Sequence, residues 1–249
     1  MKRLVVKLGT GVLSRAGGRA LDTAQFRRLA GEFAALQKKG HSIILVSSAA
    51  IAAGVRVLGL PKRPADLPGK QACAAAGQPE LMRLYSTSLK PHGLHAAQLL
   101  LTHGDIDSRT RRANARNTIY RLLESRSVIP IINENDTVAV EEVRFGDNDR
   151  LSAEVAQLLR ADHLLILTSV DGLQDTDGKR IPRVDHLEDA ARHVRPDKGE
   201  ESVGGMKTKL EAVRLALAAK IPVHILDGRR PGQLAAALAG RNVGTFFPA

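Results

Sequence analysis

The sequence predicts an α/β protein, a three-layer αβα sandwich with a mainly parallel central sheet. Short runs rich in Val, Ile and Leu alternate with helical segments along the chain, as in sheets whose parallel strands are joined by crossover helices. These runs show little polar alternation, which is typical of strands buried on both faces. No repeat, linker or composition break divides the chain, so we expect a single domain over residues 1–249.

The first half of the chain supplies four of the expected strands, at residues 3–9, 42–47, 94–102 and 127–135. Glycine-rich turns follow the first strand. A helix is expected over 22–39, where apolar side chains recur at spacings of three and four, with Asp22 or Thr23 as its cap. Further helices are expected at about 70–90 and 108–126, and the segment VAVEEVRF alternates like an edge hairpin.

The second half continues the same alternation of strands and helices. The expected helices are 149–160, a short one in LEDAARHV, a long one after the Gly204-Gly205 pair, and 231–239. The expected strands are 163–169, 222–226 and a short last one near 243–247. The order strand–helix–strand is therefore kept to the end of the chain, as a mainly parallel sheet requires.

Composition points to a protein of the reducing cytoplasm. Cys73 is the only cysteine, so no disulfide can form within the chain. No window approaches eighteen apolar residues, so we expect no membrane span. The apolar run near the N-terminus is also too short for a signal peptide.

The chain is strongly basic, with 37 Lys and Arg against 26 Asp and Glu and a net charge of +11. The densest basic segment is SRTRRANAR at 108–116. It is either a solvated helix face or a surface for phosphate or an anionic partner. The absence of interleaved aromatic residues disfavours nucleic acid, because base stacking needs them, and we favour the solvated face.

Candidate chemistry lies directly after the expected strands, because ligands of open parallel sheets gather at the carboxyl ends of the strands. Three segments there resemble phosphate sites: the GTG at 9–11, the Ser47-Ser48 pair, which we expect to open a helix, and the Gly204-Gly205 pair, which precedes Lys207 and Lys209. None of them is a Walker loop or a GxGxxG fingerprint. Together, with lysines nearby, they favour a nucleotide.

Lys7 lies inside an apolar strand, where an unpaired ammonium group is costly. One interpretation is a strand-end lysine that reaches solvent. The other is a cation aimed at a phosphoryl group, together with Lys209, since phosphoryl transfer depends on positive charge around the nonbridging oxygens. The histidines show no metal-binding spacing, so we expect no metal site made of protein side chains, and magnesium would arrive with ATP. The GxSxG elbow of a serine hydrolase is absent.

The motifs, read together, resemble those of the glutamate 5-kinases of the amino acid kinase superfamily. They are VVKLGTGVL, VSSAAIAAG, KQACAAAGQ, INENDTVA, GDNDRLSA, LTSVDGL and GGMKTK, in the family's order. The resemblance spans the chain from Lys7 to the GTFF near the C-terminus. INEND followed closely by GDND is the specific feature, since it distinguishes glutamate 5-kinases from the other kinases of the superfamily.

The resemblance implies ATP- and Mg²⁺-dependent phosphorylation of the γ-carboxylate of L-glutamate, the first step of proline synthesis. It implies that Lys7 and Lys209 lie at the transferred phosphate, that Asp149 orients them, and that Ser48, Asp136 and Asn148 bind glutamate. The expected ATP side comprises Lys7, Gly9, Thr168, Ser169, Gly204, Gly205, Met206, Lys207, Thr208 and Lys209.

The resemblance also implies an organisation. Roughly residues 1–150 would hold the acidic substrate and 151–249 the ATP, without the C-terminal PUA domain that many members have. It implies a dimer or tetramer of identical chains and feedback inhibition by L-proline near the glutamate site. A kinase of another small acid, or a non-catalytic sensor of an amino acid or nucleotide, are the alternatives.

Three positions depart from the family pattern. Ala49 replaces a glycine after the second strand, and its methyl group would narrow the site or require a negative φ. Ser169 replaces the aspartate that often follows Thr168, and Ser202-Val203 replaces a glycine-containing segment before GGM. All three lie on the phosphate and ATP side, so the glutamate signature is the better preserved part.

Overall fold

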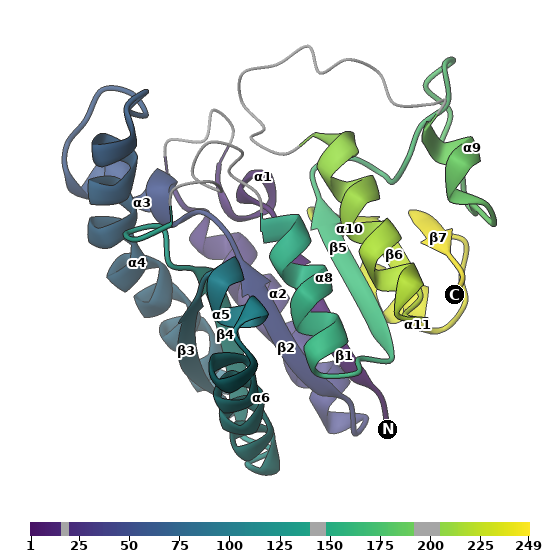
Figure 1. The fold of residues 1–249 in the computed structure, drawn as a ribbon, viewed down its shortest axis with the longest axis horizontal. Coiled ribbons are helices and arrows are strands. Elements are labelled where there is room, and N and C mark those ends of the chain that lie inside the picture. The colour runs from purple at the N-terminus through teal and green to yellow at the C-terminus, as the bar shows by residue number, and fades with distance from the viewer. Residues whose placement is uncertain (16–19, 140–147, 192–204) are drawn as a thin grey trace.

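A seven-stranded sheet of order β3-β4-β2-β1-β5-β6-β7 forms the middle of the molecule (Figure 1). The computed structural model describes residues 1–15, 20–139, 148–191 and 205–249. All neighbouring strands are parallel except β7, which runs antiparallel to β6. The strands are β1 Arg3–Leu8, β2 Ser42–Ser47, β3 His95–Leu101, β4 Val128–Glu134, β5 His163–Thr168, β6 Val223–Asp227 and β7 Thr245–Phe247.

Helices cover both faces of this sheet, which confirms the predicted three layers (Figure 1). One layer contains α1 Thr10–Leu13, α2 Thr23–Lys38, α3 Ala50–Val57, α4 Leu67–Leu89 and α11 Gln233–Leu238. The other contains α5 His103–Asp107, α6 Arg109–Glu124, α8 Asn148–Leu158, α9 Leu187–Ala191 and α10 Met206–Ala218. A 3-10 turn, η1 Lys90–His92, follows α4.

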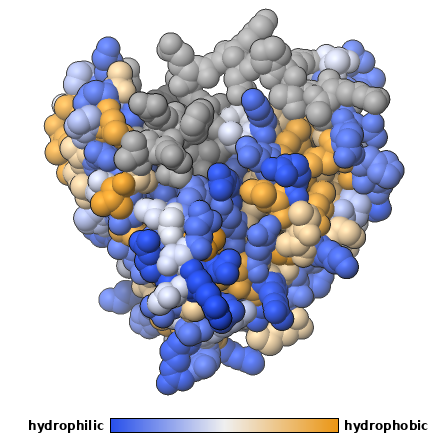
Figure 2. All heavy atoms as spheres, in the orientation of Figure 1, coloured by the Kyte–Doolittle hydropathy of each residue, from blue (hydrophilic) through white to orange (hydrophobic). Residues whose placement is uncertain are grey.

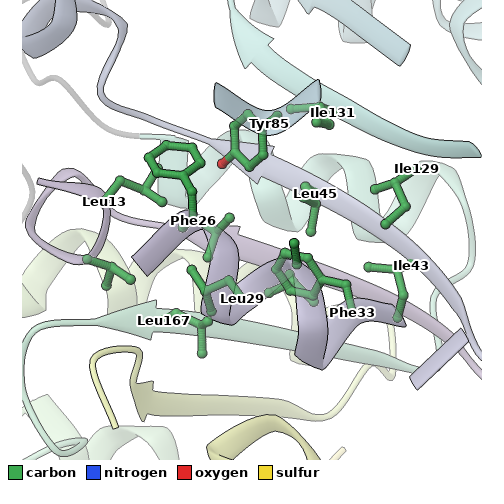
Figure 3. Packing of buried hydrophobic residues seen from close by; sticks show 14 of the residues in the cluster. Leu13, Phe26, Leu29, Phe33, Ile43, Leu45, Tyr85, Ile129, Ile131 and Leu167 are labelled. Carbon is green, nitrogen blue, oxygen red and sulfur yellow. The ribbon is translucent and has the colours of Figure 1, made fainter. Parts of the chain in front are cut away.

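Each strand divides its side chains between two apolar cores, because successive residues point to opposite faces of a sheet. Figure 3 shows the core on the α2 side, where Phe26 and Phe33 pack over Leu45 and Leu167. In β1, Leu4, Val6 and Leu8 enter this core, and Val5 enters the core under α8 and α10. The alternation therefore turns the side chain of Lys7 toward α8 and α10, the layer that contains Asp149 and Lys209.

The expected elements are found within a few residues of their predicted bounds. Two short helices were not predicted. The segment after β1 was expected to be glycine-rich turns, which is wrong for α1: Val12 and Leu13 are buried, and their burial draws Thr10–Leu13 into a helical turn. The second is α5, which begins with a capping box between Thr102 and Asp105. The predicted hairpin at 138–145 lies mostly outside the described residues.

The basic segment 108–116 forms the first half of α6, as expected. This helix buries only Ala115 and Ile119 and presents its arginines to solvent. Figure 2 shows a strongly hydrophilic surface over the lower part of this face, where α6 lies in Figure 1. An anionic partner for this surface remains a hypothesis. None of the helices in the described part of the chain is long and apolar enough to cross a membrane.

Helices α3 and α4 cross in direct backbone contact at two glycines. A Cβ atom on Gly54 would lie 1.8 Å from the Cys73 carbonyl oxygen, and one on Gly77 would lie 1.9 Å from that of Ala50. Neither approach is sterically possible, so only glycine permits this crossing. The crossing fixes the position of α4 against the carboxyl end of β2.

We predict that Gly77→Ala lowers the free energy of unfolding by about 3 kcal/mol, because the methyl group must push the two helices apart. The matched control is Gly31→Ala in α2, where the nearest heavy atom to a new Cβ, in His92, is 3.8 Å away. That change should raise the free energy of unfolding by up to about 1 kcal/mol through helix propensity. Urea denaturation measures the free energy of unfolding of both variants. Changes of the same sign and size in the two variants would contradict the close crossing of α3 and α4.

Candidate active site

The Asp149 carboxylate lies between the ammonium groups of two lysines from distant parts of the chain. Asp149 is 0% exposed, and Lys7 and Lys209 are 4% and 7% exposed. Lys7 Nζ contacts Asp149 Oδ1, and Lys209 Nζ lies 3.1 Å from Asp149 Oδ2. The interpretation of Lys7 as a strand-end lysine that reaches solvent is therefore wrong. We call these three residues the lysine–aspartate triad.

Each member of the triad is delivered by a different element. Lys7 comes from β1, Asp149 from the first turn of α8, and Lys209 from the first turn of α10. Thr208 fixes the geometry, because its hydroxyl lies 3.3 Å from Asp149 Oδ2 and 2.9 Å from the Gly205 carbonyl oxygen. The triad itself carries one negative and two positive charges, and all three side chains are buried. Such a group is suited to bind and stabilise phosphoryl oxygens.

Most of the other predicted ATP-side residues lie on β1, β5 and α10 or directly after these elements. A Cβ atom on Gly9 would lie 3.4 Å from the Leu167 carbonyl oxygen and 3.9 Å from Lys7 Nζ, so this glycine lies beside the ammonium group. Thr168 ends β5 next to β1, and a Cβ on Gly11 would be 3.3 Å from Ser169 Oγ. Gly205 caps α10, Met206 opens it and Lys207 is exposed. Gly204 lies outside the described residues.

On the opposite side of the triad, Asn148 brings the substrate-side residues together. Its amide nitrogen lies 3.4 Å from Ser48 Oγ and donates to the carbonyl oxygen of Ser47. The same nitrogen donates to Asn133 Oδ1 over 2.7 Å. Ser48 and Asn148, which were predicted together, are thus neighbours, and Asn133, a strand-end residue to which the sequence analysis gave no role, contacts Asn148.

A cavity of about 390 Å³ opens beside these residues. Asp136 lines it, together with Gln78 of α4, Gln98 of β3 and two alanines of α4, Ala74 and Ala75. Pro79, also in the wall, has no N–H, so α4 lacks its usual hydrogen bond to the Ala75 carbonyl. The wall also includes Glu134 and Asn135, so it combines two carboxylates, three amides and a backbone acceptor with small apolar side chains, a set suited to a small charged molecule.

Two buried groups behind the cavity are chemically inert. The hydroxyl of Tyr85 lies 2.7 Å from Ser47 Oγ at the end of β2, and burial raises the pKa of this phenol. Burial likewise raises the pKa of the Cys73 thiol, which packs against Ile51 and Val55 of α3. Both groups stay protonated, so they support the site structurally and neither acts as a nucleophile.

No group of three or more His, Cys, Asp or Glu side chains suited to hold a metal occurs among the residues that the structure describes. The triad itself pairs its carboxylate with two cations, which makes it a site for anions rather than for a metal ion. A magnesium ion at this site would therefore be held mainly by the phosphates that it accompanies.

Comparison with known proteins now decides the family. The model of the amino acid kinase family matches residues 2–227. The glutamate 5-kinase of Thermus thermophilus is 49% identical, over 100% of this chain and 68% of its own length. The glutamate 5-kinases of Pelobacter propionicus and Anaeromyxobacter dehalogenans are 44% and 48% identical over 99% of this chain. The chain belongs to the glutamate 5-kinases of the amino acid kinase family.

Ala49 departs from the glutamate 5-kinase pattern at a conformationally special position. It has φ 83° and ψ 7°, the left-handed conformation that glycine adopts without strain, and it caps α3. Of the two expected consequences of an alanine here, a negative φ is not adopted, because the chain keeps the glycine-type backbone around the added methyl group. The methyl is buried, and left-handed backbone costs an alanine about 1–2 kcal/mol. The Ser202-Val203 departure lies outside the described residues.

We predict that Ala49→Gly raises the free energy of unfolding by about 0.5–1 kcal/mol. Relief of the left-handed strain stabilises the folded state, and the extra entropy that glycine gives the unfolded chain offsets part of this gain in stability. Ala52→Gly, in the regular part of α3, is the control and should lower the same quantity by about 0.5–1 kcal/mol. Chemical denaturation measures both variants, and a destabilised Ala49→Gly protein would show that the backbone here is unstrained.

Proposed function

We propose that this protein transfers the γ-phosphoryl group of ATP to the γ-carboxylate of L-glutamate, giving L-glutamyl 5-phosphate and ADP. The reaction is the first step of proline biosynthesis. The observation that carries the proposal is the lysine–aspartate triad next to the Ser48–Asn148 contact. The triad is suited to the phosphoryl group. Asn148, the residue before Asp149, and its neighbour Ser48 are suited to an amino acid.

The chemistry needs no strong general base, because a carboxylate is already a nucleophile. A γ-carboxylate oxygen forms a bond to the γ-phosphorus, and the bond from that phosphorus to the bridging oxygen of ADP breaks. The difficulty is to bring two anions together, so positive charge must surround the phosphoryl oxygens throughout the transfer. Lys7 and Lys209 supply it, and Asp149 holds both ammonium groups in place. Magnesium that is bound to ATP supplies further charge neutralisation.

The amino-acid end of glutamate requires groups of the opposite kind. Its α-ammonium needs acceptors, which we assign to Asp136 in the cavity wall and to Asn148. Ser48, hydrogen-bonded through its N–H to the Leu8 carbonyl oxygen over 3.1 Å, lies between this end and the end of β1, where the γ-carboxylate would meet the phosphate. We therefore assign residues 1–150 mainly to glutamate and 151–249 mainly to ATP, with Thr168, Ser169 and the first turn of α10 on the nucleotide side.

Three further properties belong to the proposal. We place the reaction in the cytoplasm, where ATP, glutamate and a free buried Cys73 thiol are all expected. We expect feedback inhibition by L-proline at or near the glutamate cavity. We also expect a dimer or tetramer of this chain, which size-exclusion chromatography with light scattering measures.

We predict that the protein forms a hydroxamate from hydroxylamine only when L-glutamate, ATP and magnesium are all present. Lys209→Ala should lower kcat at least about 10²-fold, because it removes one of two cations at the phosphoryl group. Lys38→Ala, an exposed lysine at the end of α2, is the charge-matched control and should keep kcat within about twofold.

Two outcomes would contradict the proposal. Faster turnover of aspartate, acetylglutamate, carbamate or UMP would indicate a kinase of another small acid. Binding of glutamate and ATP in calorimetry without hydroxamate formation would indicate a non-catalytic sensor.

A further inference from the structure

Four amide side chains form a continuous hydrogen-bonded row from the edge of the sheet to the start of α8. We call Gln98, Gln78, Asn133 and Asn148 the amide row. Asn148 Nδ2 donates to Asn133 Oδ1 over 2.7 Å, and Asn133 Nδ2 donates to Gln78 Oε1 over 2.8 Å. Gln78 Nε2 donates to Gln98 Oε1 over 2.8 Å. The three inner members are buried, with at most 9% exposure, and Gln98 is exposed at the edge strand.

Backbone groups at the Asn133–Asn148 end fix the direction of every hydrogen bond in the row. The N–H of Glu134, which can only donate, lies 2.9 Å from Asn133 Oδ1. That oxygen must therefore accept, and Asn148 must offer it an N–H. The Ser47 carbonyl, which can only accept, binds the same Asn148 nitrogen. Asn133 then has its Nδ2 directed at Gln78, whose carbonyl oxygen is the acceptor that this donor needs.

This direction determines which end of the Asn148 amide is presented to a ligand. Its Nδ2 is held by Asn133 and Ser47, so its carbonyl oxygen, at the other end of the planar amide group, points away from these two partners. A carbonyl oxygen is attractive to an ammonium group, and an amide N–H is repulsive. Were Asn133 to lose its acceptor at Gln78, its buried Nδ2 would be left unsatisfied, and this cost opposes the hydrogen bond from the Glu134 N–H that holds the amide in place. The amide would then shift or turn and release Asn148 from this orientation.

We propose that Gln78 is a positioning residue for recognition of the substrate's α-ammonium group. Gln78 acts through Asn133 on the orientation of Asn148. This proposal rests on the proposed function, because it takes the ligand to be an α-amino acid with a second carboxylate. Gln78 also lines the cavity that contains Asp136, so it is close to the ligand that it helps to select.

The consequence is a change in selectivity rather than a general loss of binding. L-Glutamate and glutarate share the chain of five carbons and two carboxylates, and glutarate lacks the ammonium group. Disturbing Asn148 should weaken the binding of L-glutamate and not that of glutarate, because a hydrogen bond to a charged group contributes a factor of about ten or more to affinity. A purely structural disturbance of α4 would weaken both ligands by a similar factor.

The test is the dissociation constants of L-glutamate and glutarate, measured by calorimetry, for the full chain and three variants. Gln78→Met keeps the length of the side chain and removes its acceptor, and it should weaken L-glutamate at least about tenfold and glutarate less than about threefold. Gln78→Glu keeps an acceptor for Asn133, and the ratio of the two constants should return to within about threefold of the original. Gln157→Met is the matched control, an exposed glutamine of α8 bound to the Leu215 carbonyl, and should leave both constants within about twofold.

The inference is overturned if Gln78→Met weakens both ligands equally, or if it leaves L-glutamate binding unchanged. It is also overturned if Gln78→Glu shows the same loss of selectivity as Gln78→Met. Since the measured quantity is binding, this test can fail independently of the test of the kinase reaction. A selectivity change without hydroxamate formation refutes the kinase reaction alone, and hydroxamate formation with unchanged selectivity refutes the role of Gln78 alone.

Discussion

A single carboxylate enclosed by two ammonium groups is the constraint on which the site depends. Burying either lysine without a partner would be strongly unfavourable, and removing one member of a buried ion pair commonly costs about 3–5 kcal/mol. Asp149 therefore makes the burial of Lys7 and Lys209 possible, and in doing so it joins β1, α8 and α10 at one point. In the proposed function, the two ammonium groups also bind the transferred phosphoryl group, whose negative charge complements theirs.

The residue before Asp149 connects this anion site to the amino-acid site. Successive residues of an α-helix are rotated by about 100°, so neighbours at the start of α8 face different surroundings. Asp149 faces the lysines and Asn148 faces the ends of β2 and β4. In the proposed function, one helix start thus sets the distance between the place that we assign to the phosphoryl group and the place that we assign to the ammonium group. The acidic stretch INENDTVAVEEVRFGDND divides accordingly: Asp136 lines the cavity, Asp149 orients lysines, and residues 140–147 lie outside the described residues.

The sequence was sufficient for the sheet, because strands buried on both faces produce uninterrupted apolar runs such as SIILVS and HLLILT. It also pointed to Lys7, since a charge inside such a run requires a partner. That its partner is a residue 142 positions away is a property of the fold, and the sequence reached Asp149 only through the family motif. The missed helix α5 had a readable signal, the capping box at Thr102 and Asp105.

The amide row had no comparable signal. Gln78 ends the alanine-rich stretch KQACAAAGQ and Asn133 lies near the end of an apolar strand, and an amide in such a segment has no characteristic spacing. Its role depends on which donor or acceptor of another element lies opposite, and that is known only when α4, β4 and α8 are packed together. Polar networks between elements are thus the part of a site that one-dimensional patterns describe least well.

The central claim is that the triad holds the transferred phosphoryl group while the adjacent polar residues hold an amino acid. A crystal structure with a non-hydrolysable ATP analogue, magnesium and L-glutamate tests it most directly. The account predicts γ-phosphoryl oxygens within hydrogen-bond reach of both Lys7 Nζ and Lys209 Nζ, with the γ-carboxylate of glutamate between them and Ser48. A nucleotide bound away from these two lysines, or a glutamate whose α-ammonium is remote from Asp136 and Asn148, would contradict it.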